Sequence, residues 1–485
     1  MMFGLSLPST VRRLATANLA CTFVVLLAGC NTHGTGSYPP ELTYPARTDP
    51  LVLEKPAGER VYADQPGTMD QLIQTIGIEE KDGGPGGQLL RVTDAPADER
   101  DKLNSALQKI FGTPFEPTVK LEEAIATKIV AEMNDDATKT KLGITDYKKT
   151  PIEDLTLDNA TLAAGSQLYR RHCLTCHGLT GDGRGPTAAW IHPHPRDYRQ
   201  GVFKFVSTSA DKLDDVARKP HRSDLIRTLT SGVDGTTMPS FALLPADQLE
   251  QLVSYVIHLS IRGEVEFAVL RSYAPGKPME DNSGNTLTDL DAKLRFAFQR
   301  AVTNWVKSNL EETVAKPPAY HADLPEGNPG RYGPVSEKER LESVRAGYIL
   351  FTNSTPDQNP KYFNGLGACL RCHQDFGRQA NFLFDQWGTL VRPANLTLGV
   401  YRGGRRPIDL YWRIFSGIGT HMPASKIAIK DADGDPTDEL DGKKYWDLIS
   451  FVQALPYPEM LPSDVRAKIY PSSQPMAGEQ QHASR

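Results

Sequence analysis

The stretch Cys173-Leu174-Thr175-Cys176-His177 decides how this sequence is interpreted, because its order C-x-x-C-H is the attachment signature of a c-type haem. Two thiols three positions apart add across the two vinyl groups of one porphyrin, and the adjacent His supplies the proximal nitrogen ligand of the iron. The same order returns in Cys369-Leu370-Arg371-Cys372-His373. The sequence therefore predicts two covalently attached haem c groups, with His177 and His373 as proximal ligands.

Two other uses of paired cysteines explain the pattern less well. A zinc ribbon needs its two pairs about 15–20 residues apart, whereas these pairs lie in different halves of the chain. A thioredoxin-like dithiol does not require the His that follows each pair here. The chain has six cysteines, and the other two, Cys21 and Cys30, lie near the N-terminus. No disulfide is therefore expected in the mature domains.

Residues 1–29 have the pattern of a targeting segment. Arg12 and Arg13 precede an apolar stretch that is too short to span a bilayer. The segment ends Leu27-Ala28-Gly29-Cys30, which resembles a bacterial lipoprotein cleavage box in which Cys30 becomes the lipidated first residue. An ordinary secretory signal with a chance Cys is the alternative. We expect an exported protein that is lipid-anchored to a bacterial membrane, with domains facing the periplasm or cell exterior and no transmembrane helix.

Composition and periodicity divide the rest of the chain. The formal net charge of −5 argues against nucleic acid as a partner, because a nucleic-acid footprint would be basic. Helical spacing of apolar residues recurs in two regions outside the repeats, and their role is not evident from the sequence. The predicted segments are a flexible tether (30–65), an N-terminal helical segment (66–155), a first repeat (156–265), an interdomain helical linker (266–335), a second repeat (336–460) and a disordered tail (461–485).

The two repeats share features beyond the haem motifs, in the same order. Ala164-Gly165 and Ala346-Gly347 each open a helix before the motif. Further pairs at matching places are Pro195-Arg196-Asp197-Tyr198 with Pro393-Ala394-Asn395-Leu396, Asp224-Leu225 with Asp409-Leu410, and Thr236-Thr237-Met238-Pro239 with Thr420-His421-Met422-Pro423. We interpret this order as an internal duplication.

Met238 and Met422 are the candidate distal ligands. A thioether is a soft, neutral ligand that raises the reduction potential of a haem iron. Each Met precedes a Pro, which restricts it to extended geometry. His421 is the rival at the second site, where an imidazole would lower the potential. The first repeat has Thr237 at the matching position, which favours Met in both.

Together the two repeats resemble class I cytochrome c domains. The resemblance implies a mainly α fold, with two such helical domains plus the N-terminal helical segment and the interdomain helical insert. It also implies that the carbonyl of Pro186 accepts the proton of the first proximal His. Residues 374–379 of the second copy lack a Pro, so that its His must find another acceptor. Aromatic and Arg contacts to haem propionates are implied as well, with Arg184, Trp190, Tyr198, Arg405 and Trp412 as candidates.

The whole sequence is similar to lipoprotein cytochrome c subunits that accompany bacterial quinol-oxidising complexes or haem–copper oxidases. The resemblance implies a membrane-anchored di-haem protein of a respiratory chain, which transfers single electrons and is not itself an enzyme. Its partners would be a quinol-oxidising complex, a terminal oxidase or a dehydrogenase. The alternative is a di-haem peroxidase or the haem subunit of a periplasmic dehydrogenase. A peroxidase needs a displaceable ligand at one iron, and a Met-Pro in each copy disfavours it.

Overall fold

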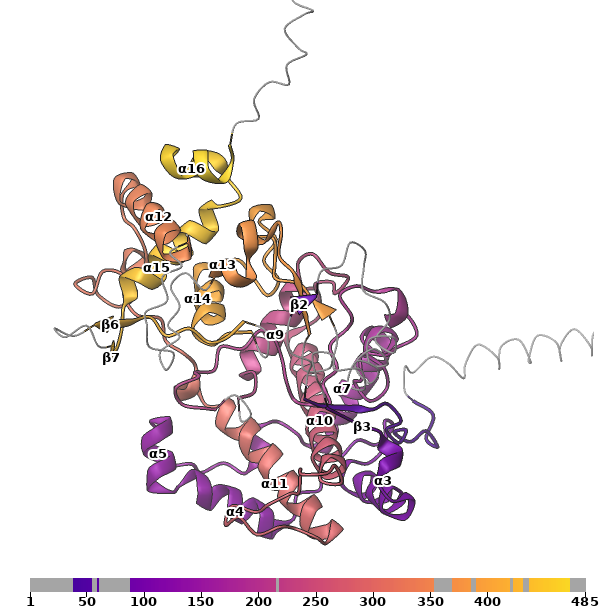
Figure 1. The fold of residues 1–485 in the computed structure, drawn as a ribbon. Coiled ribbons are helices and arrows are strands. Elements are labelled where there is room, and N and C mark those ends of the chain that lie inside the picture. Colours follow the sequence, from indigo (N-terminus) through magenta and orange to yellow (C-terminus); the bar gives the residue numbers. More distant parts are fainter. Residues whose placement is uncertain are drawn as a thin grey trace, which may run out of the picture.

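The fold is mainly helical, as the sequence predicts (Figure 1). The computed structural model describes residues 38–54, 59–60, 88–214, 218–352, 369–384, 390–418, 422–430 and 436–471. The predicted signal segment, Cys30 and His421 lie outside these residues.

The α-helices of the described residues fall into three groups along the chain. The N-terminal group is α3 (Ala97–Phe111), α4 (Glu123–Met133), α5 (Asp136–Leu142) and α6 (Pro151–Asp154). The first repeat and the insert contribute α7 (Asn159–His172), α8 (Leu174–His177), α9 (Arg222–Ser231), α10 (Ala246–Arg271) and α11 (Leu290–Ser308). The second repeat contributes α12 (Glu337–Thr352), α13 (Cys369–Cys372), α14 (Pro407–Phe415), α15 (Gly442–Ala454) and α16 (Ser463–Ile469).

The strands are short and form three small antiparallel sheets. β1 (Leu51–Glu54) pairs with β3 (Gln88–Leu90), and β6 (Ala428–Lys430) pairs with β7 (Pro436–Leu440). β4 (Phe382–Phe384) lies between β5 (Leu390–Val391) and β2 (Glu59–Arg60), so a segment near the N-terminus extends a hairpin of the second repeat.

The two repeats are built on the same helix crossing. In the first, α7 crosses α10 at Gly165, where an added Cβ would lie 2.2 Å from the carbonyl oxygen of Gln251. In the second, α12 crosses α15 at Gly347, where an added Cβ would lie 2.0 Å from that of Asp447. Neither contact leaves room for a side chain, since atoms in protein interiors are close-packed. The glycines that the duplication places in register thus have the same structural role.

One core joins the first repeat to the N-terminal helices and the insert. The insert helix α11 faces this core, with Phe298 and Trp305 almost completely buried. The Phe298 ring lies edge-on to Phe111 of α3, with centroids 5.5 Å apart. Burying an aromatic side chain of this kind contributes about 1.5–3 kcal/mol. The predicted boundary at 265/266 is wrong as a break between elements, because α10 runs on to Arg271 and buries Val269 and Leu270 in the same core.

The described part of the predicted tether is packed against the first repeat. Tyr38 and Leu51 are buried, and the Tyr44 hydroxyl lies 2.9 Å from that of Tyr255 on α10. Arg199 forms two hydrogen bonds with the buried carboxylate of Asp49, at 2.7 and 2.9 Å. The prediction of a flexible tether is therefore wrong for residues 38–54. We call this segment the strap.

A second core lies within residues 315–469. It includes Leu461, and it includes Val465 and Ile469 of α16, which are almost completely buried. Val465 and Ile469 are four positions apart and share one face of α16, and Leu461 lies just before that helix. The predicted disordered tail is thus wrong for residues 461–471, and the rest of that tail lies outside the described residues.

No helix in the described part of the chain is both long and apolar enough to cross a bilayer.

Candidate haem sites

The first motif is held on a single helical turn. α7 ends at His172, and the backbone N–H of His177 donates to the carbonyl of Cys173 at 2.8 Å. The buried Tyr169 hydroxyl donates to the carbonyl of Gly178 at 2.9 Å and fixes the residue that ends this turn. One turn brings residues four positions apart onto one side of the helix. The two thiols and the imidazole therefore start from a common, supported segment.

The ring of His177 is oriented from two directions. Its Nδ1 lies 3.1 Å from the carbonyl oxygen of Arg196, and its face stacks on Tyr198 with ring centroids 4.8 Å apart. Since a carbonyl only accepts, Nδ1 carries the proton, which leaves the Nε2 lone pair for a metal. Burial lowers the pKa of His177 to about 4, so that the ring is neutral at pH 7. A neutral, oriented imidazole is the form that ligates iron.

The acceptor of this proton differs from the one expected. Pro186 is exposed, and the loop around it packs on the motif through backbone N–H groups, with Gly183 donating to His177 and Gly185 to Cys176. The segment that follows then turns back and presents the carbonyl of Arg196. The assignment of Pro186 as the residue that orients His177 is therefore corrected to Arg196.

The second proximal His has the equivalent acceptor. His373 Nδ1 lies 3.0 Å from the carbonyl oxygen of Ala394, which the duplication aligns with Arg196. Burial lowers the pKa of His373 as well. In both repeats the next residue closes a matching turn: Asp197 accepts from the N–H of Arg199, and Asn395 from that of Thr397. The missing Pro in the second copy therefore makes no difference to how its His is held.

The duplicated Pro195-Arg196-Asp197-Tyr198 segment carried the signal for this acceptor, because it keeps its place in both copies. Its side chains differ between the copies, however, and only the backbone carbonyl is shared. A search by residue type therefore does not find it.

The Met-Pro loops have matching backbone geometry. In the first repeat, the N–H of Val233 donates to the carbonyl of Met238 at 3.2 Å, after Gly232 at φ 69°. In the second, the N–H of Ile418 donates to the carbonyl of Met422 at 2.8 Å, after Gly417 at φ 74°. In both repeats the carbonyl of the Met thus accepts from the residue that follows a glycine with positive φ, although the second loop is one residue shorter than the first.

A large cavity joins the parts of the first site. It contains about 1350 Å³ of space not filled by atoms, including space open to solvent. Cys173, Cys176, His177 and Met238 all line it. Its other walls are mostly apolar and include Leu225, Leu229, Phe241, Leu252, Val253 and Val256. A hydrophobic slot with two thiols, an imidazole and a thioether fits a covalently held haem.

Of the candidate propionate contacts, one lines the first cavity. Tyr198 lines the first cavity. Trp190 is 83% exposed, and the guanidinium of Arg405 donates to the Tyr457 hydroxyl. The indole N–H of Trp412 donates to the carbonyl of Ala315. Reasoning within one repeat missed a different residue, Arg402, which belongs to the second repeat but lines the first cavity.

Burial disfavours ionisation of the first thiol in each motif. Burial raises the pKa of Cys173 to about 12 and that of Cys369 to about 11. Each motif therefore presents a protonated thiol at neutral pH, which limits reaction with other thiols before attachment.

Comparison with known proteins bears on the first repeat. Residues 160–256 match the family model described as cytochrome c oxidase, cbb3-type, subunit III. This range includes the first motif, Met238 and most of the cavity wall. The chain therefore contains a cytochrome c domain, which implies covalently bound haem c and haem-based electron transfer.

The wider comparisons add less. A chain of the reducing HAO-like protein complex of Kuenenia stuttgartiensis is similar to this one at 20% identity and a TM-score of 0.33, over 60% of this chain and 95% of that chain. A search of curated proteins finds no match.

Proposed function

We propose that this chain is a di-haem cytochrome c that relays single electrons outside the cytoplasm, as a subunit or partner of a quinol-oxidising complex or a haem–copper oxidase. The observation that carries the proposal is the matched pair of proximal sites, in which His177 and His373 meet the carbonyls of Arg196 and Ala394 at 3.1 and 3.0 Å. The contact that orients the first proximal His is thus repeated at the second.

The residues of the first site define its chemistry. The haem supplies a reversible one-electron couple of its iron. Cys173 and Cys176 would hold the porphyrin, and His177 and Met238 would ligate its iron. An iron with both axial positions filled has no place for a substrate, which favours electron transfer over turnover. The apolar wall around the cavity keeps the local dielectric low, so nearby charges act strongly on the potential.

For the second site the proposal rests on repetition. Cys369, Cys372 and His373 have the motif order, and Met422 lies on the matching loop. His421, the rival ligand, lies outside the described residues.

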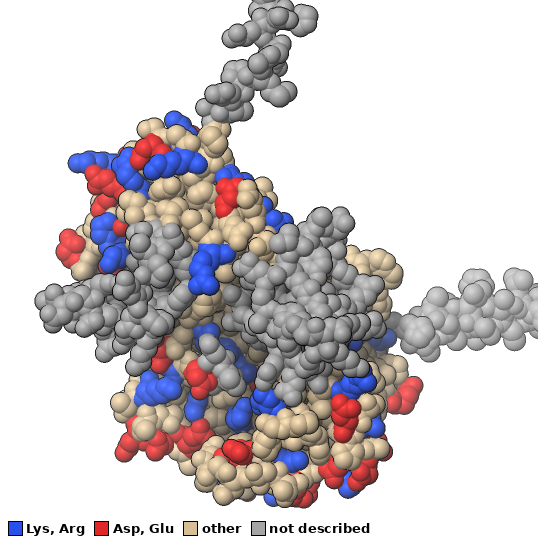
Figure 2. All heavy atoms as spheres, in the orientation of Figure 1, with Lys and Arg blue, Asp and Glu red and all other residues tan. Residues whose placement is uncertain are grey.

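The location and the partners rest on other observations. The sequence that ends at Cys30 supports export and a lipid anchor, with the domains at the outer side of a bacterial membrane. Figure 2 shows acidic and basic side chains interspersed over the described part of the viewed face, without a single-sign field there. Recognition of a redox partner on this face would then depend on local contacts rather than on long-range steering.

The haem count can be tested with paired variants. The exported full-length protein should contain two haems by pyridine haemochrome assay and by mass. The variant C173S/C176S and the variant C369S/C372S should each contain one. A wild-type protein with one haem, lost only when the first pair is changed, would contradict the di-haem proposal.

The class of function can be tested on the same samples. Both haems should be low-spin and six-coordinate, and the protein should not turn over peroxide. A high-spin band together with peroxidase activity would instead support the enzyme alternative.

The partner can be tested in native membranes. After solubilisation in mild detergent, the tagged protein should bring down subunits of a quinol-oxidising complex or a terminal oxidase in stoichiometric amount. A C30A variant should leave the membrane fraction. A C30A variant that stays membrane-bound would contradict the lipid anchor.

A further inference from the structure

The second repeat reaches into the first haem site. Arg402 lies in the loop between the short 3-10 helix η7 (Leu396–Leu398) and α14, and it lines the cavity that holds His177 and Met238. Among the described residues that line this cavity, it is the one that the second repeat supplies; the others fall between 172 and 256.

The loop that carries Arg402 is seated against both walls of the first site. On the distal side, Val400 contacts Gly235 of the Met238 loop, where an added Cβ would lie 2.6 Å from the Val side chain. On the other side, an added Cβ at Gly403 would lie 2.4 Å from the ring of Phe205, which itself lines the cavity. Gly403 has φ 84°, a conformation that a glycine adopts without strain.

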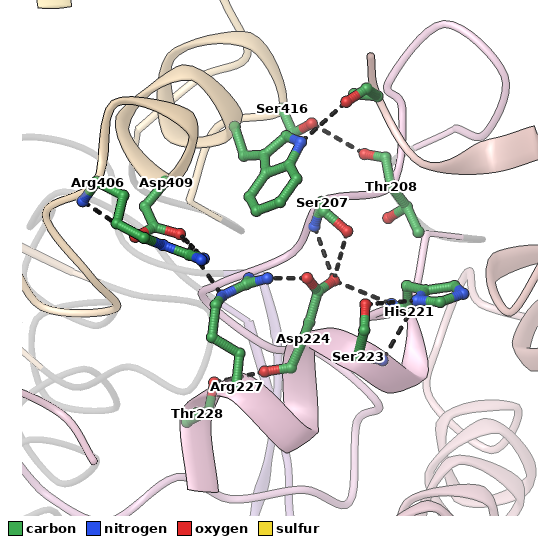
Figure 3. A network of polar contacts seen from close by, with 12 residues as sticks. Ser207, Thr208, His221, Ser223, Asp224, Arg227, Thr228, Arg406, Asp409 and Ser416 are labelled. Atoms are coloured by element: carbon green, nitrogen blue, oxygen red, sulfur yellow. Dashed lines mark hydrogen bonds and ion pairs between the residues drawn. The ribbon is translucent and has the colours of Figure 1, made fainter. Parts of the chain in front are cut away.

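A buried polar network behind this loop holds the two repeats together (Figure 3). Arg227 of α9 donates to Asp224 at 2.8 Å and lies 3.7 Å from Asp409 of α14. The hydroxyl of Ser416 donates to the carbonyl of Thr208 at 2.9 Å across the same boundary. Both carboxylates are almost completely buried. The position of Arg402 over the first cavity is therefore part of a fixed interface between the repeats.

The charge of Arg402 is not balanced within the described structure. Its guanidinium forms no hydrogen bond or ion pair with any residue that the structure describes, and the cavity lining includes no Asp or Glu. Lys204 and Arg196 line the same cavity. A pocket that is apolar inside, with cations and no carboxylates in its lining, suits a flat apolar ligand with anionic substituents. A haem carries two such substituents, its propionate carboxylates.

We propose that Arg402 of the second repeat binds a propionate carboxylate of the haem attached to Cys173 and Cys176, so that the second domain helps to set the potential of the first haem. The inference rests on the haem of the first cytochrome domain and not on the presence of a second one. A cation beside a haem stabilises the reduced state relative to the oxidised state, because reduction removes one positive charge from the iron.

The test is a potentiometric titration of exported, full-length holoprotein. R402Q should lower the midpoint potential of the first haem by the equivalent of about threefold to tenfold in its reduction equilibrium, where tenfold is about 59 mV for one electron. R402E should lower it further, and R402K should recover part of the loss because it keeps the charge without the planar fork. The wave of the first haem is identified as the one that M238A displaces.

The matched control is R405Q, which removes the same charge from the same loop. Arg402 and Arg405 are both exposed to solvent, but Arg405 does not line the first cavity and donates instead to the Tyr457 hydroxyl. The first potential should therefore stay unchanged in this variant. An equal shift of the first potential in R402Q and R405Q would show that any nearby surface charge has the same effect, and it would overturn the proposal. An unchanged potential in R402E would overturn it as well.

Haem content is measured on each sample and separates this inference from the di-haem proposal. A single redox wave would count against two haems and would still report on Arg402. Infrared difference spectra of the propionate carboxylates give a second readout, because a carboxylate that loses its guanidinium partner should change its stretching frequency in R402Q alone.

Discussion

Arg227 in the first repeat lies over Trp412 in the second, with its guanidinium carbon 4.7 Å from the ring centroid. The two residues occupy equivalent places, three positions after Asp224 and three positions after Asp409. The duplicated helices α9 and α14 therefore contact each other through residues at equivalent positions, with a cation against an aromatic face.

Removal of the guanidinium should loosen this interface. R227A leaves Asp224 with the N–H and hydroxyl of Ser207 and the N–H of His221, so its carboxylate is not fully stranded. We expect a loss of about 1–3 kcal/mol in the free energy of unfolding, measured by urea titration. The exposed K338A serves as control and should leave stability unchanged. If the interface holds Arg402 in place, R227A should also lower the potential of the first haem. A loss of stability with no change in potential would show that the interface does not position Arg402.

Displacement of the carbonyl that orients His177 should change the first haem. Gly183 has φ 72°, and an added Cβ would lie 2.5 Å from the carbonyl oxygen of Pro195, next to Arg196. G183A should cost about 2–3 kcal/mol of stability from strain and contact. It should also raise the potential of the first haem, because an imidazole that donates a weaker hydrogen bond is a poorer electron donor to the iron.

Two controls isolate that effect. Gly284 has φ 82° with nothing within 4 Å of an added Cβ, so G284A should show the backbone strain of about 1–2 kcal/mol alone, with the potential unchanged. P186A should leave the potential unchanged as well, since the acceptor is Arg196. A shift in P186A that matches that of G183A would contradict this assignment.

The distal ligands can be assigned one at a time. M238A and M422A should each remove one Met–iron charge-transfer band and lower the potential of one haem, because a soft neutral thioether favours ferrous iron. H421A should leave both bands in place. If M422A keeps its spectrum and H421A loses a low-spin site, then the second iron is bound by two imidazoles.

The strap makes stability depend on acid pH through Asp49. Burial alone would raise the pKa of this carboxyl, but Arg199 and Arg47 lower it below its usual range. A group with a depressed folded pKa stabilises the fold above its unfolded pKa, about 3.9, and loses that contribution as the pH falls through the folded pKa. Wild-type stability should therefore fall below about pH 4.

The corresponding variant is D49N. We expect it to lose about 2–3 kcal/mol at pH 7, because Arg199 would keep only Asp197 as an ionic partner, and to show a shallower decline in acid. The exposed D98N is the control and should follow the wild-type curve. Parallel curves for D49N and wild type below pH 4 would show that Asp49 does not carry the acid dependence.

Local spacing was sufficient for some features and not for others. The haem motifs, the Met-Pro loops and the helix-crossing Gly165 and Gly347 follow from short patterns repeated in register. The buried residues Leu461, Val465 and Ile469 are also spaced by four. The segment that contains them is short and close to the end of the chain, so this spacing does not stand out from its polar neighbours.

Other features depend on residues that are distant in the sequence. Asp49 is 150 positions from Arg199, and nothing in the composition of the strap indicates that partner. The acceptor for His177 is a backbone carbonyl, which residue types do not encode. Arg402 reaches the first cavity only because the two repeats are packed together, and a duplication in sequence does not specify how its copies dock.

The packed strap also constrains how far the first haem could stand from a membrane. Tyr38 is buried and lies under the guanidinium of Arg170, three residues before Cys173. If Cys30 carries the proposed lipid, eight Cα-to-Cα steps separate it from Tyr38, and fully extended they span at most about 29 Å. The first domain would then sit at a short standoff from the bilayer instead of swinging on a long arm. Its haem would meet partners embedded in the same membrane by lateral diffusion in two dimensions. The second haem would be attached farther from Cys30 in the sequence.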